Sequence, residues 1–300
     1  MRLIAVVGPT AAGKSDLALT LARAYDGEIV NADAMQLYRG LDIGTAKATS
    51  AERAEVPHHL LDILDVTQSA SVAAYQRDAR AAVERVLAAG RTPVLVGGSG
   101  LYVQAVVDEL EFPGTDPALR AELAAELERV GPAALHARLA TSDPAAAAAV
   151  LPSNGRRIVR ALEVIALTGR PFTARLPEAA TPRYDAVLLG VDRPTAELDE
   201  RIARRVARMF AAGLVAETRG LLPGLRDGQT AARALGYQQV LAALENGDLE
   251  AAAVDTVTAT RRFVRRQRSW FRRDRRIVWL AGESSDVGDR AHAAIGASVR

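Results

Sequence analysis

The 300-residue sequence has no cysteine, almost no lysine and few aromatic residues. The absence of cysteine excludes disulfides and thiolate metal sites, and it is compatible with a reducing cytoplasm. No apolar run approaches the roughly 20 residues of a membrane helix, and the run at the N-terminus is too short for a secretory signal. The remaining composition, 49% hydrophobic and 25% charged, is ordinary for a globular protein. We therefore expect a cytoplasmic protein without membrane contact.

Lysine occurs only at Lys14 and Lys47, and arginine supplies the rest of the 38 basic residues. The formal net charge of +2 is unevenly distributed. Residues 255–300 contain 11 arginines against 5 acidic residues, whereas residues 1–254 carry a net charge of −4. A basic end on a slightly acidic body indicates either a polyanionic partner or a solvated helix face.

Short β-rich runs alternate with helical stretches along most of the chain, which is typical of a mostly parallel sheet flanked by helices. Strands are expected at residues 3–7, 28–31, 93–96, 186–191 and 276–280. Helices are expected at residues 14–25, 71–89 and 255–273. The pattern predicts an α/β core.

The segment between Pro113 and Pro182 has a different pattern. It contains helical stretches separated by proline and glycine, with no strand pattern between them. The expected helices are 117–130, 133–140, 144–150 and 156–168. We predict an all-helical insertion domain at 113–182, within a core domain formed by 1–112 and 183–300.

A phosphate-binding motif follows the first expected strand. Residues 8–15, GPTAAGKS, satisfy G-x-x-x-x-G-K-[ST] between a strand and a helix. The loop amides and the helix N-terminus would form an anion nest, Lys14 adds a positive charge, and the Ser15 hydroxyl can ligate Mg²⁺. The predicted diphosphate- or nucleotide-binding residues are Gly8, Pro9, Thr10, Ala11, Ala12, Gly13, Lys14 and Ser15. With the alternating elements, the motif predicts a P-loop NTPase-like fold.

The motif alone does not decide the reaction. A kinase or nucleotide hydrolase would need an apolar strand ending in an acid that holds Mg²⁺. The strand at 93–96 ends in Gly-Gly-Ser instead. Asp33 follows the strand at 28–31, at the sheet edge where α/β proteins place their ligands.

The block Asp33–Lys47, DAMQLYRGLDIGTAK, closely resembles the signature of bacterial tRNA dimethylallyltransferases, also called tRNA isopentenyltransferases. Further blocks follow in the order of that family, so that the resemblance extends from residue 8 to about residue 273. They are 57–63 (PHHLLDI), 97–102 (GGSGLY), 157–163 (RIVRALE), 234–237 (ALGY), and the Arg, Gln and Trp-Phe-Arg residues of 260–272. The chain differs at Ser99, where the family often has threonine, and at Ala34, where it often has serine.

The resemblance implies transfer of a dimethylallyl group from its diphosphate to N6 of an adenosine. The acceptor would be the nucleoside 3′-adjacent to the anticodon, position thirty-seven, in tRNAs reading codons that begin with U. It also implies Asp33 as general base, with Lys14, Ser99 and Arg233 as further catalytic residues. The residues alone leave Asp33 open as a helix cap or Mg²⁺ ligand, Arg233 as a surface arginine, and Ser99 as a turn serine.

A larger set of residues is expected to bind tRNA. Gln36 suits adenine recognition, because an amide can bond the N6 and N7 atoms of a base flipped out of its loop. The full set is Asp33, Ala34, Met35, Gln36, Ser99, Arg120, Arg156, Arg157, Ile158, Val159 and Arg160. Tyr38 and Arg39 are open between RNA contact and packing, while His58 and His59 are expected to be structural.

The helix expected at 255–273 is amphipathic, with one apolar face and many arginines on the rest of its surface. Phe263, Gln267, Trp270 and Phe271 form the face expected to be buried. The basic residues would bind RNA phosphates. They are Arg261, Arg262, Arg265, Arg266, Arg268, Arg272 and Arg273.

The predicted partners are dimethylallyl diphosphate, Mg²⁺ and the anticodon stem-loop of tRNA, which the insertion and the core would contact from two sides. We expect a monomer. Three alternatives remain open: prenylation of free adenine nucleotides as in cytokinin synthesis, a small-molecule kinase, and a non-catalytic RNA-binding protein with a nucleotide switch.

Overall fold

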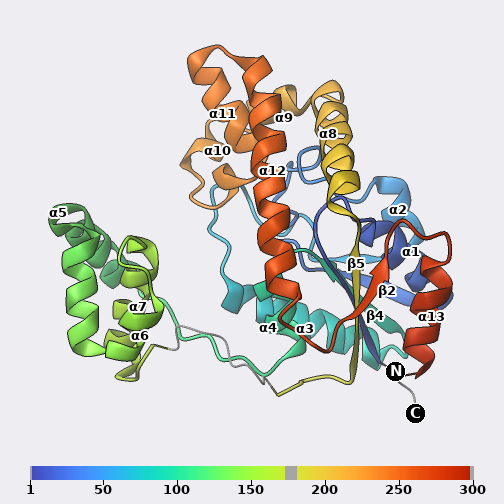
Figure 1. Ribbon diagram of the computed structural model, residues 1–300, viewed down its shortest axis with the longest axis horizontal. Coiled ribbons are helices and arrows are strands. Elements are labelled where there is room, and N and C mark those ends of the chain that lie inside the picture. Colours follow the sequence, from blue (N-terminus) through green and yellow to red (C-terminus); the bar gives the residue numbers. More distant parts are fainter. Residues whose placement is uncertain (1, 173–180, 298–300) are drawn as a thin grey trace. The chain divides into compact units, whose positions relative to one another are not determined.

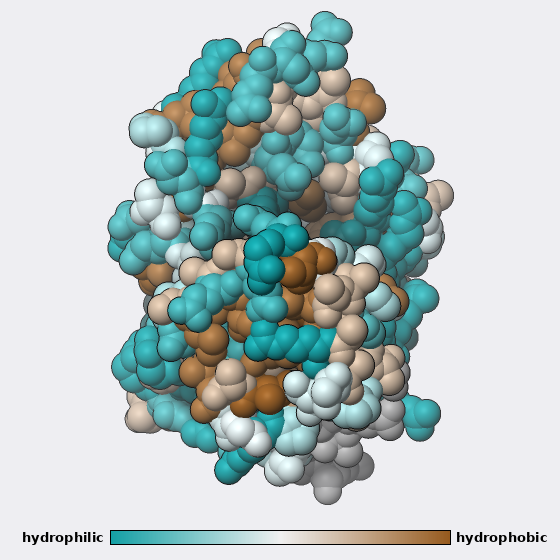
Figure 2. All heavy atoms as spheres, turned by 90° about the vertical axis from the view of Figure 1, so that its left-hand side faces the viewer, coloured by the Kyte–Doolittle hydropathy of each residue, from teal (hydrophilic) through white to brown (hydrophobic). Residues whose placement is uncertain are grey.

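The computed structural model describes residues 2–172 and 181–297 (Figure 1). The chain forms two compact units. The core unit comprises Met1–Asp108 and Pro182–Arg300, and the insertion unit comprises Glu109–Thr181. The insertion therefore starts four residues earlier than the expected range of 113–182, and it ends one residue earlier than that range. None of the described helices is long and apolar enough to cross a membrane. On the face shown in Figure 2, hydrophilic side chains are spread between the apolar ones.

The core unit contains a six-stranded sheet in which every pair of neighbouring strands is parallel. The strand order is β3-β2-β4-β1-β5-β6. The strands are β1 Leu3–Val7, β2 Gly27–Asn31, β3 His58–His59, β4 Thr92–Gly97, β5 Ala186–Asp192 and β6 Val278–Ala281. This confirms the predicted fold class. The edge strand β3 was not expected, because two residues carry no periodicity that a sequence could reveal.

The sheet is the middle of three layers, as the alternating side chains of β1 show. Ile4 and Val6 belong to one apolar cluster, whereas Leu3, Ala5 and Val7 belong to another. Because successive side chains of a strand point to opposite faces, the two clusters lie on opposite sides of the sheet. All five residues of β1 are buried, which is why this strand reads as an unbroken apolar run.

Helices cover both faces (Figure 1). The cluster that contains Ile4 packs against α1 Lys14–Ala24, α8 Thr195–Ala211 and α13 Val287–Ala297. The cluster that contains Leu3 packs against α3 Val72–Ala88 and α4 Gly100–Val107. The short helix α2 Ser50–Glu55 begins with a capping box between Thr49 and Glu52.

The long helix α12 spans Leu249–Phe271 and begins six residues before the predicted start. Asp248 caps it, because its side chain accepts a hydrogen bond from the Ala251 N–H. Val264, Gln267 and Phe271 are buried. Phe263 was expected on this face but is only partly buried, and the Arg266 guanidinium lies 5.6 Å from the centre of its ring.

A further group of helices, not predicted from the sequence, packs around the segment that follows β2. Tyr38 and Leu41 are fully buried in this cluster. The Tyr38 hydroxyl donates to Gln68 O and accepts from the Ala70 N–H. Of the two interpretations left open for Tyr38, packing is therefore the one observed. The helices are α9 Leu214–Gly220, α10 Gly224–Asp227, the 3₁₀ helix η1 Ala231–Arg233 and α11 Tyr237–Asn246.

In the described part of the insertion unit every regular element is a helix. Its helices are α5 Pro117–Ser142, α6 Pro144–Ala149 and α7 Gly155–Thr168. The two helices expected before Pro144 are both present within α5, because the run is broken by a kink where Gly131 has a non-helical φ of 78° and Pro132 follows. The core of the unit is apolar and includes Leu135, Leu139 and Ile158.

One buried acid organises the insertion. The side chain of Glu163 on α7 has no exposed surface. It accepts hydrogen bonds from the guanidinium groups of Arg120, at 2.6 Å, and Arg160, at 2.8 Å, and from the Asp116 N–H at 3.0 Å. Burial would raise the pKa of Glu163, but these hydrogen bonds outweigh it and lower the pKa below its ordinary value. The Arg120–Glu163 ion pair therefore joins α5 to α7, while the Arg160–Glu163 pair lies within α7.

Glu163→Ala should destabilise the insertion by about 2–3 kcal/mol, because two guanidinium groups and one amide lose a charged acceptor. The lowered pKa means that the unfolded carboxyl binds a proton more readily than the folded one. The Glu163 carboxylate therefore stabilises the insertion fully at neutral pH. This stabilisation is lost as the pH falls below about 4.5, the ordinary pKa of a glutamate. Hydrogen exchange of the α5 and α7 amides measures both effects, and a pH-independent difference between wild type and Glu163→Ala would contradict the second.

Candidate active site

Three loops of the core unit meet at the carboxyl edge of the sheet. β2, β4 and β1 are neighbours, so the segments that follow them lie next to one another. The segment after β2 begins with Ala32 and contains Asp33, the predicted base. The segment after β4 begins with Gly98 and contains Ser99, and the segment after β1 begins with Gly8 and is the phosphate-binding motif. Open α/β sheets place their ligands at this edge.

The phosphate loop follows β1 closely and requires glycine at Gly8. Its φ is 136°, and a Cβ there would lie 2.2 Å from Val191 O of the neighbouring strand. The loop closes around the Lys14 side chain, because Lys14 Nζ donates to Pro9 O at 2.6 Å. Lys14 and Ser15 open α1, whose N-terminus supports an anion.

Burial and neighbouring charges shift the pKa of Lys14. Burial lowers its pKa from 10.5 to about 8, Asp33 opposes this shift, and Arg205 adds to it. The same lysine is thus close enough to both a carboxylate and a guanidinium to be affected by their charges. A buried ammonium of this kind gains more from a bound anion than an exposed one does.

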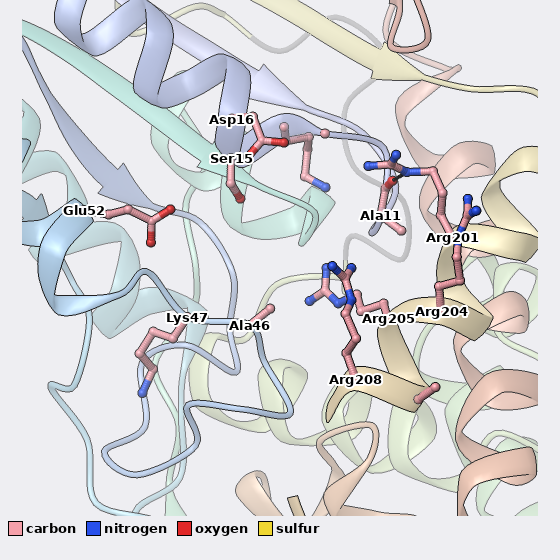
Figure 3. Close-up of a pocket in the computed structure, with 13 residues that line it drawn as sticks. Ala11, Ser15, Asp16, Ala46, Lys47, Glu52, Arg201, Arg204, Arg205 and Arg208 are labelled. Atoms are coloured by element: carbon pink, nitrogen blue, oxygen red, sulfur yellow. Dashed lines mark hydrogen bonds between the residues drawn. The ribbon is translucent and has the colours of Figure 1, made fainter. Parts of the chain in front are cut away.

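A cavity of about 830 Å³ lies beside the phosphate loop (Figure 3). One wall is formed by Ala11, Gly13, Lys14, Ser15 and Asp16, and a second by Ala46, Lys47 and Glu52. The third wall is α8, which contributes Arg201, Arg204, Arg205 and Arg208. The cavity is therefore lined mainly by positive charge.

The α8 arginines were missed by the sequence analysis. Arg201 Nε donates to Ala11 O of the phosphate loop at 2.8 Å, and Arg205 donates to Thr45 O at 3.2 Å. Burial lowers the pKa of Arg205, Asp33 raises it, and Arg208 lowers it further. Spacings of three, four and seven residues put these arginines on one helix face, which is the only signal that the sequence offered.

Asp33 lies in the turn that follows β2. Its N–H donates to the Asn31 side chain, and its Oδ1 accepts from the Met35 N–H at 2.9 Å. The bond to Met35 closes a turn and not a helix, so the helix-cap interpretation is wrong. Among the residues that the structure describes, no hydrogen bond to the other carboxylate oxygen, Oδ2, is observed. The strand β2 before Asp33 and the strand β1 before the phosphate loop both pair in parallel with β4, so this carboxylate lies at the same sheet edge as the loop, where its charge raises the pKa of Lys14 and Arg205.

Ser99 is tied to the same turn. Its N–H donates to Ala32 O at 3.4 Å, and its Oγ accepts from the Ala34 N–H at 3.2 Å. Two tyrosine rings, Tyr75 and Tyr102, lie 4.3 Å apart nearby. Burial raises the pKa of Tyr102 to about 12, with smaller contributions from Tyr38 and Asp33. The structure therefore ties Ser99 to the residues on either side of Asp33, and its catalytic role stays a prediction.

Two other predicted site residues have different surroundings. Gln36 Nε2 donates to Thr45 O at 3.2 Å, so part of its amide is used within the protein. Met35 and Ala34 are partly buried in the same turn. Arg233 lies exposed on η1 and is not among the residues that line the cavity. Asp33 and Ser99 are not among the lining residues either; with Lys14 they follow neighbouring strands at the carboxyl edge of the sheet, whereas Arg233 lies on a separate 3₁₀ helix.

The residues proposed to bind tRNA from the insertion need correction. Ile158 and Val159 are buried in the apolar core of that unit, so contact of their side chains with RNA is wrong. Arg120 and Arg160 hold Glu163, an intramolecular role that the sequence did not indicate. Arg156 and Arg157 are exposed in the first turn of α7.

The basic face of α12 is smaller than expected. Arg268 is not part of it, because it forms an ion pair with Asp192 at 2.8 Å and is mostly buried. Arg272 also contacts Asp192, and Arg261 contacts Asp199. We call the exposed arginines Arg262, Arg265, Arg266 and Arg273 the α12 basic strip; Arg273 follows the end of the helix, and Arg272, although exposed, is left out because it pairs with Asp192.

The remaining candidates have structural partners. His58 Nδ1 bonds with Val56 O, and His59 Nε2 lies 2.5 Å from the Glu28 carboxylate. Lys47 is buried between Asp42 and Asp62, each at 2.6 Å. Exposed Arg39 pairs with Asp65.

Comparison with known proteins identifies the family. The profile of the IPP transferase family matches residues 36–274. The tRNA dimethylallyltransferase of Salinispora arenicola is 65% identical over 300 residues, which cover 99% of this chain and 87% of that protein. The chain belongs to the IPP transferase family. The tRNA dimethylallyltransferase of Streptomyces avermitilis is 64% identical over 296 residues, covering 98% of this chain and 95% of that protein.

Solved structures of IPP transferases agree with the fold. The full-length tRNA isopentenylpyrophosphate transferase from Bacillus halodurans superposes with a TM-score of 0.73 at 38% identity. The match covers 99% of this chain and 97% of that one. The resemblance noted in the sequence, and the fold class that it implied, are confirmed.

The lowered pKa of Lys14 predicts how anion binding depends on pH. The free lysine loses its proton as the pH rises through about 8, and a bound diphosphate would restore it. Affinity for inorganic diphosphate should therefore fall by about tenfold between pH 7 and pH 9, as calorimetry would show. Lys14→Arg keeps its charge in this range, so its affinity should stay flat. An equally flat profile for the wild type would contradict the assignment.

Proposed function

We propose that this IPP transferase transfers a dimethylallyl group from dimethylallyl diphosphate to N6 of the adenosine 3′-adjacent to the anticodon of tRNA, and releases diphosphate. The observation that carries the proposal is the position of Asp33, a carboxylate close to Lys14 and Arg205 at the edge of a phosphate site. A base and an anion site in one place suit the alkylation of an amine by an allylic diphosphate. The relatives named tRNA dimethylallyltransferase support the choice of donor and acceptor.

The phosphate loop and α8 would bind the diphosphate. As the bond to the allylic carbon breaks, negative charge accumulates on the leaving oxygen, and fixed cations stabilise it more than mobile water does. Lys14, Arg205 and Arg208 line one cavity, where Arg205 lowers the pKa of Lys14 and Arg208 lowers that of Arg205, and this repulsion between cations favours an anion between them. We assign Arg205 the role beside the leaving group that the resemblance gave to Arg233.

Asp33 and Ser99 would act on the acceptor. N6 of the adenosine forms a bond to the allylic carbon while the carbon–oxygen bond breaks and its electron pair leaves with the diphosphate. The amine becomes positively charged and transfers a proton to Asp33 Oδ2, the oxygen that Met35 does not occupy. The Ser99 Oγ accepts a hydrogen bond from Ala34, which leaves its own O–H to donate to the substrate.

Mg²⁺ fits this site as an ion carried by the diphosphate. Among residues 2–172 and 181–297 no group of three or more His, Cys, Asp or Glu side chains is placed to hold a metal. Ser15, however, lines the cavity at the N-terminus of α1. Mg²⁺ commonly keeps several waters and binds few protein oxygens together with substrate phosphates. Ser15 would hold the ion, and the ion would neutralise part of the diphosphate charge.

A surface for RNA supports tRNA as the acceptor over a free nucleotide. The α12 basic strip, Arg262, Arg265, Arg266 and Arg273, is exposed on the core unit, and Arg156 and Arg157 are exposed on the insertion. Arginines of this kind bind phosphates of the RNA backbone. A prenyltransferase of free adenine nucleotides would need neither group. The acceptor base would be flipped out of the anticodon loop and would meet Gln36 beside Asp33.

Asp33→Asn should lower kcat for dimethylallyl transfer to unmodified tRNA by about 10²–10⁴-fold, because the amide cannot accept the proton. The asparagine side chain keeps an oxygen that accepts from the Met35 N–H. The substitution also removes the negative charge that attracts the Lys14 ammonium, so the affinity for inorganic diphosphate should be unchanged or higher. Transfer of radiolabelled dimethylallyl measures the rate, with AMP and ATP as rival acceptors. Asp65→Asn, an exposed carboxylate, is the control. Label on AMP in place of tRNA would reject the proposed acceptor.

Arg205→Gln should weaken binding of inorganic diphosphate by about tenfold and lower kcat, because one buried cation of the anion site is lost. It should also raise the pKa of Lys14, since Arg205 contributes to its lowering. The pH profile of diphosphate affinity would then shift to higher pH. Arg290→Gln removes an exposed arginine of α13 and is the control. Wild-type affinity together with an unshifted profile in Arg205→Gln would refute the role.

A further inference from the structure

A buried glutamine of α12 joins two loops of the candidate active site. The Thr10 N–H donates to Gln267 Oε1 at 2.9 Å, and Gln267 Nε2 donates to Gly98 O at 3.0 Å. Gln267 is 5% exposed, so both bonds are shielded from water. If the amide were rotated by half a turn, its NH₂ group would face the Thr10 N–H and its oxygen would face Gly98 O. The two partners therefore fix this side chain in one position.

The helix lies directly on the turn after β4. A Cβ at Gly98 would lie 2.2 Å from Gln267 Nε2, and a Cβ at Gly100 would lie 2.1 Å from Trp270 Cδ1. Both positions thus admit only glycine while α12 stays where it is. The glycines let the helix approach the backbone closely enough for a glutamine to reach both loops.

Each of the two loops carries one half of the site. Thr10 belongs to the phosphate loop, between Pro9, which holds the Lys14 ammonium, and Ala11, which accepts from Arg201. Gly98 precedes Ser99, which is bonded to Ala32 and Ala34 on either side of Asp33. Gln267 therefore lies between the phosphate loop and the turn that carries Asp33, the proposed base.

We propose that Gln267 is a positioning residue that fixes the phosphate loop relative to the Ser99–Asp33 turn. Without the amide, the Thr10 and Gly98 peptides lose their partner and each loop is free to shift. A displacement of about 1 Å between reacting groups can lower a rate by about 10²-fold. The expected effect on transfer rests on the proposed function, whereas the effect on diphosphate binding does not.

Two substitutions separate positioning from packing. Gln267→Leu keeps most of the volume and removes both hydrogen bonds. Gln267→Glu keeps the shape; its ionised carboxylate still accepts from Thr10 but opposes Gly98 O, while the protonated acid donates to Gly98 O and restores both bonds. Burial raises the pKa of such a carboxyl, so its protonation falls in an accessible range. Val264→Ala is the matched control, because Val264 is buried on the same helix within an apolar cluster.

We expect Gln267→Leu to weaken inorganic diphosphate binding by about tenfold, measured by calorimetry, and to lower kcat of transfer by about 10- to 100-fold. Gln267→Glu should be similarly slow at pH 8, and its kcat relative to wild type should rise as the pH is lowered to 6. Val264→Ala should lower the melting temperature without either change.

Three results would overturn the inference. One is diphosphate affinity and kcat of Gln267→Leu within twofold of wild type. Another is a Gln267→Glu profile that parallels the wild type between pH 6 and pH 8. The third is equal losses in Val264→Ala, which would show a packing effect. If the wild type binds diphosphate but does not prenylate tRNA, the proposed function fails, and the diphosphate affinities alone decide the role of Gln267.

Discussion

The site depends on the parallel order of three adjacent strands. Because β2, β4 and β1 run in the same direction, their carboxyl ends deliver Asp33, Ser99 and the phosphate loop to one edge. The three segments are far apart in the sequence, and hydrogen bonds hold them together: Ser99 to Ala32 and Ala34, and Gln267 to Thr10 and Gly98. Without this register the same residues would form three unrelated turns.

The site also keeps positive charges close together in a partly desolvated cavity. Burial lowers the pKa of both Lys14 and Arg205; Asp33 opposes this at both residues, while Arg205 adds to the lowering at Lys14 and Arg208 adds to it at Arg205. Such an arrangement is unfavourable for folding and favourable for an anionic ligand. The apolar layers on both faces of the sheet supply the stability that lets the cavity exist.

The sequence predicted the parts of the site that are local. The phosphate loop is a continuous motif, and Asp33 follows its strand directly, so both were recognised. The α8 arginines lie about 190 residues further along, and only the fold brings Arg201 to Ala11. The burial of single residues was not recognised either: Ile158 and Val159 lie in the apolar core of the insertion, and Arg268, one of many arginines along α12, pairs with Asp192.

The scarcity of lysine has a chemical consequence. An amine reacts with acylating reagents in its neutral form, and the lowered pKa of Lys14 makes that form abundant in mildly alkaline solution. Lys47, the other lysine, is buried and bonded to Asp42, Asp62 and Tyr38 O. Apart from the α-amino group, the enzyme therefore offers acylating reagents one favoured nitrogen, at the centre of its phosphate loop. Arginine-rich composition thus makes the phosphate loop a natural point for attaching a single spectroscopic or affinity label.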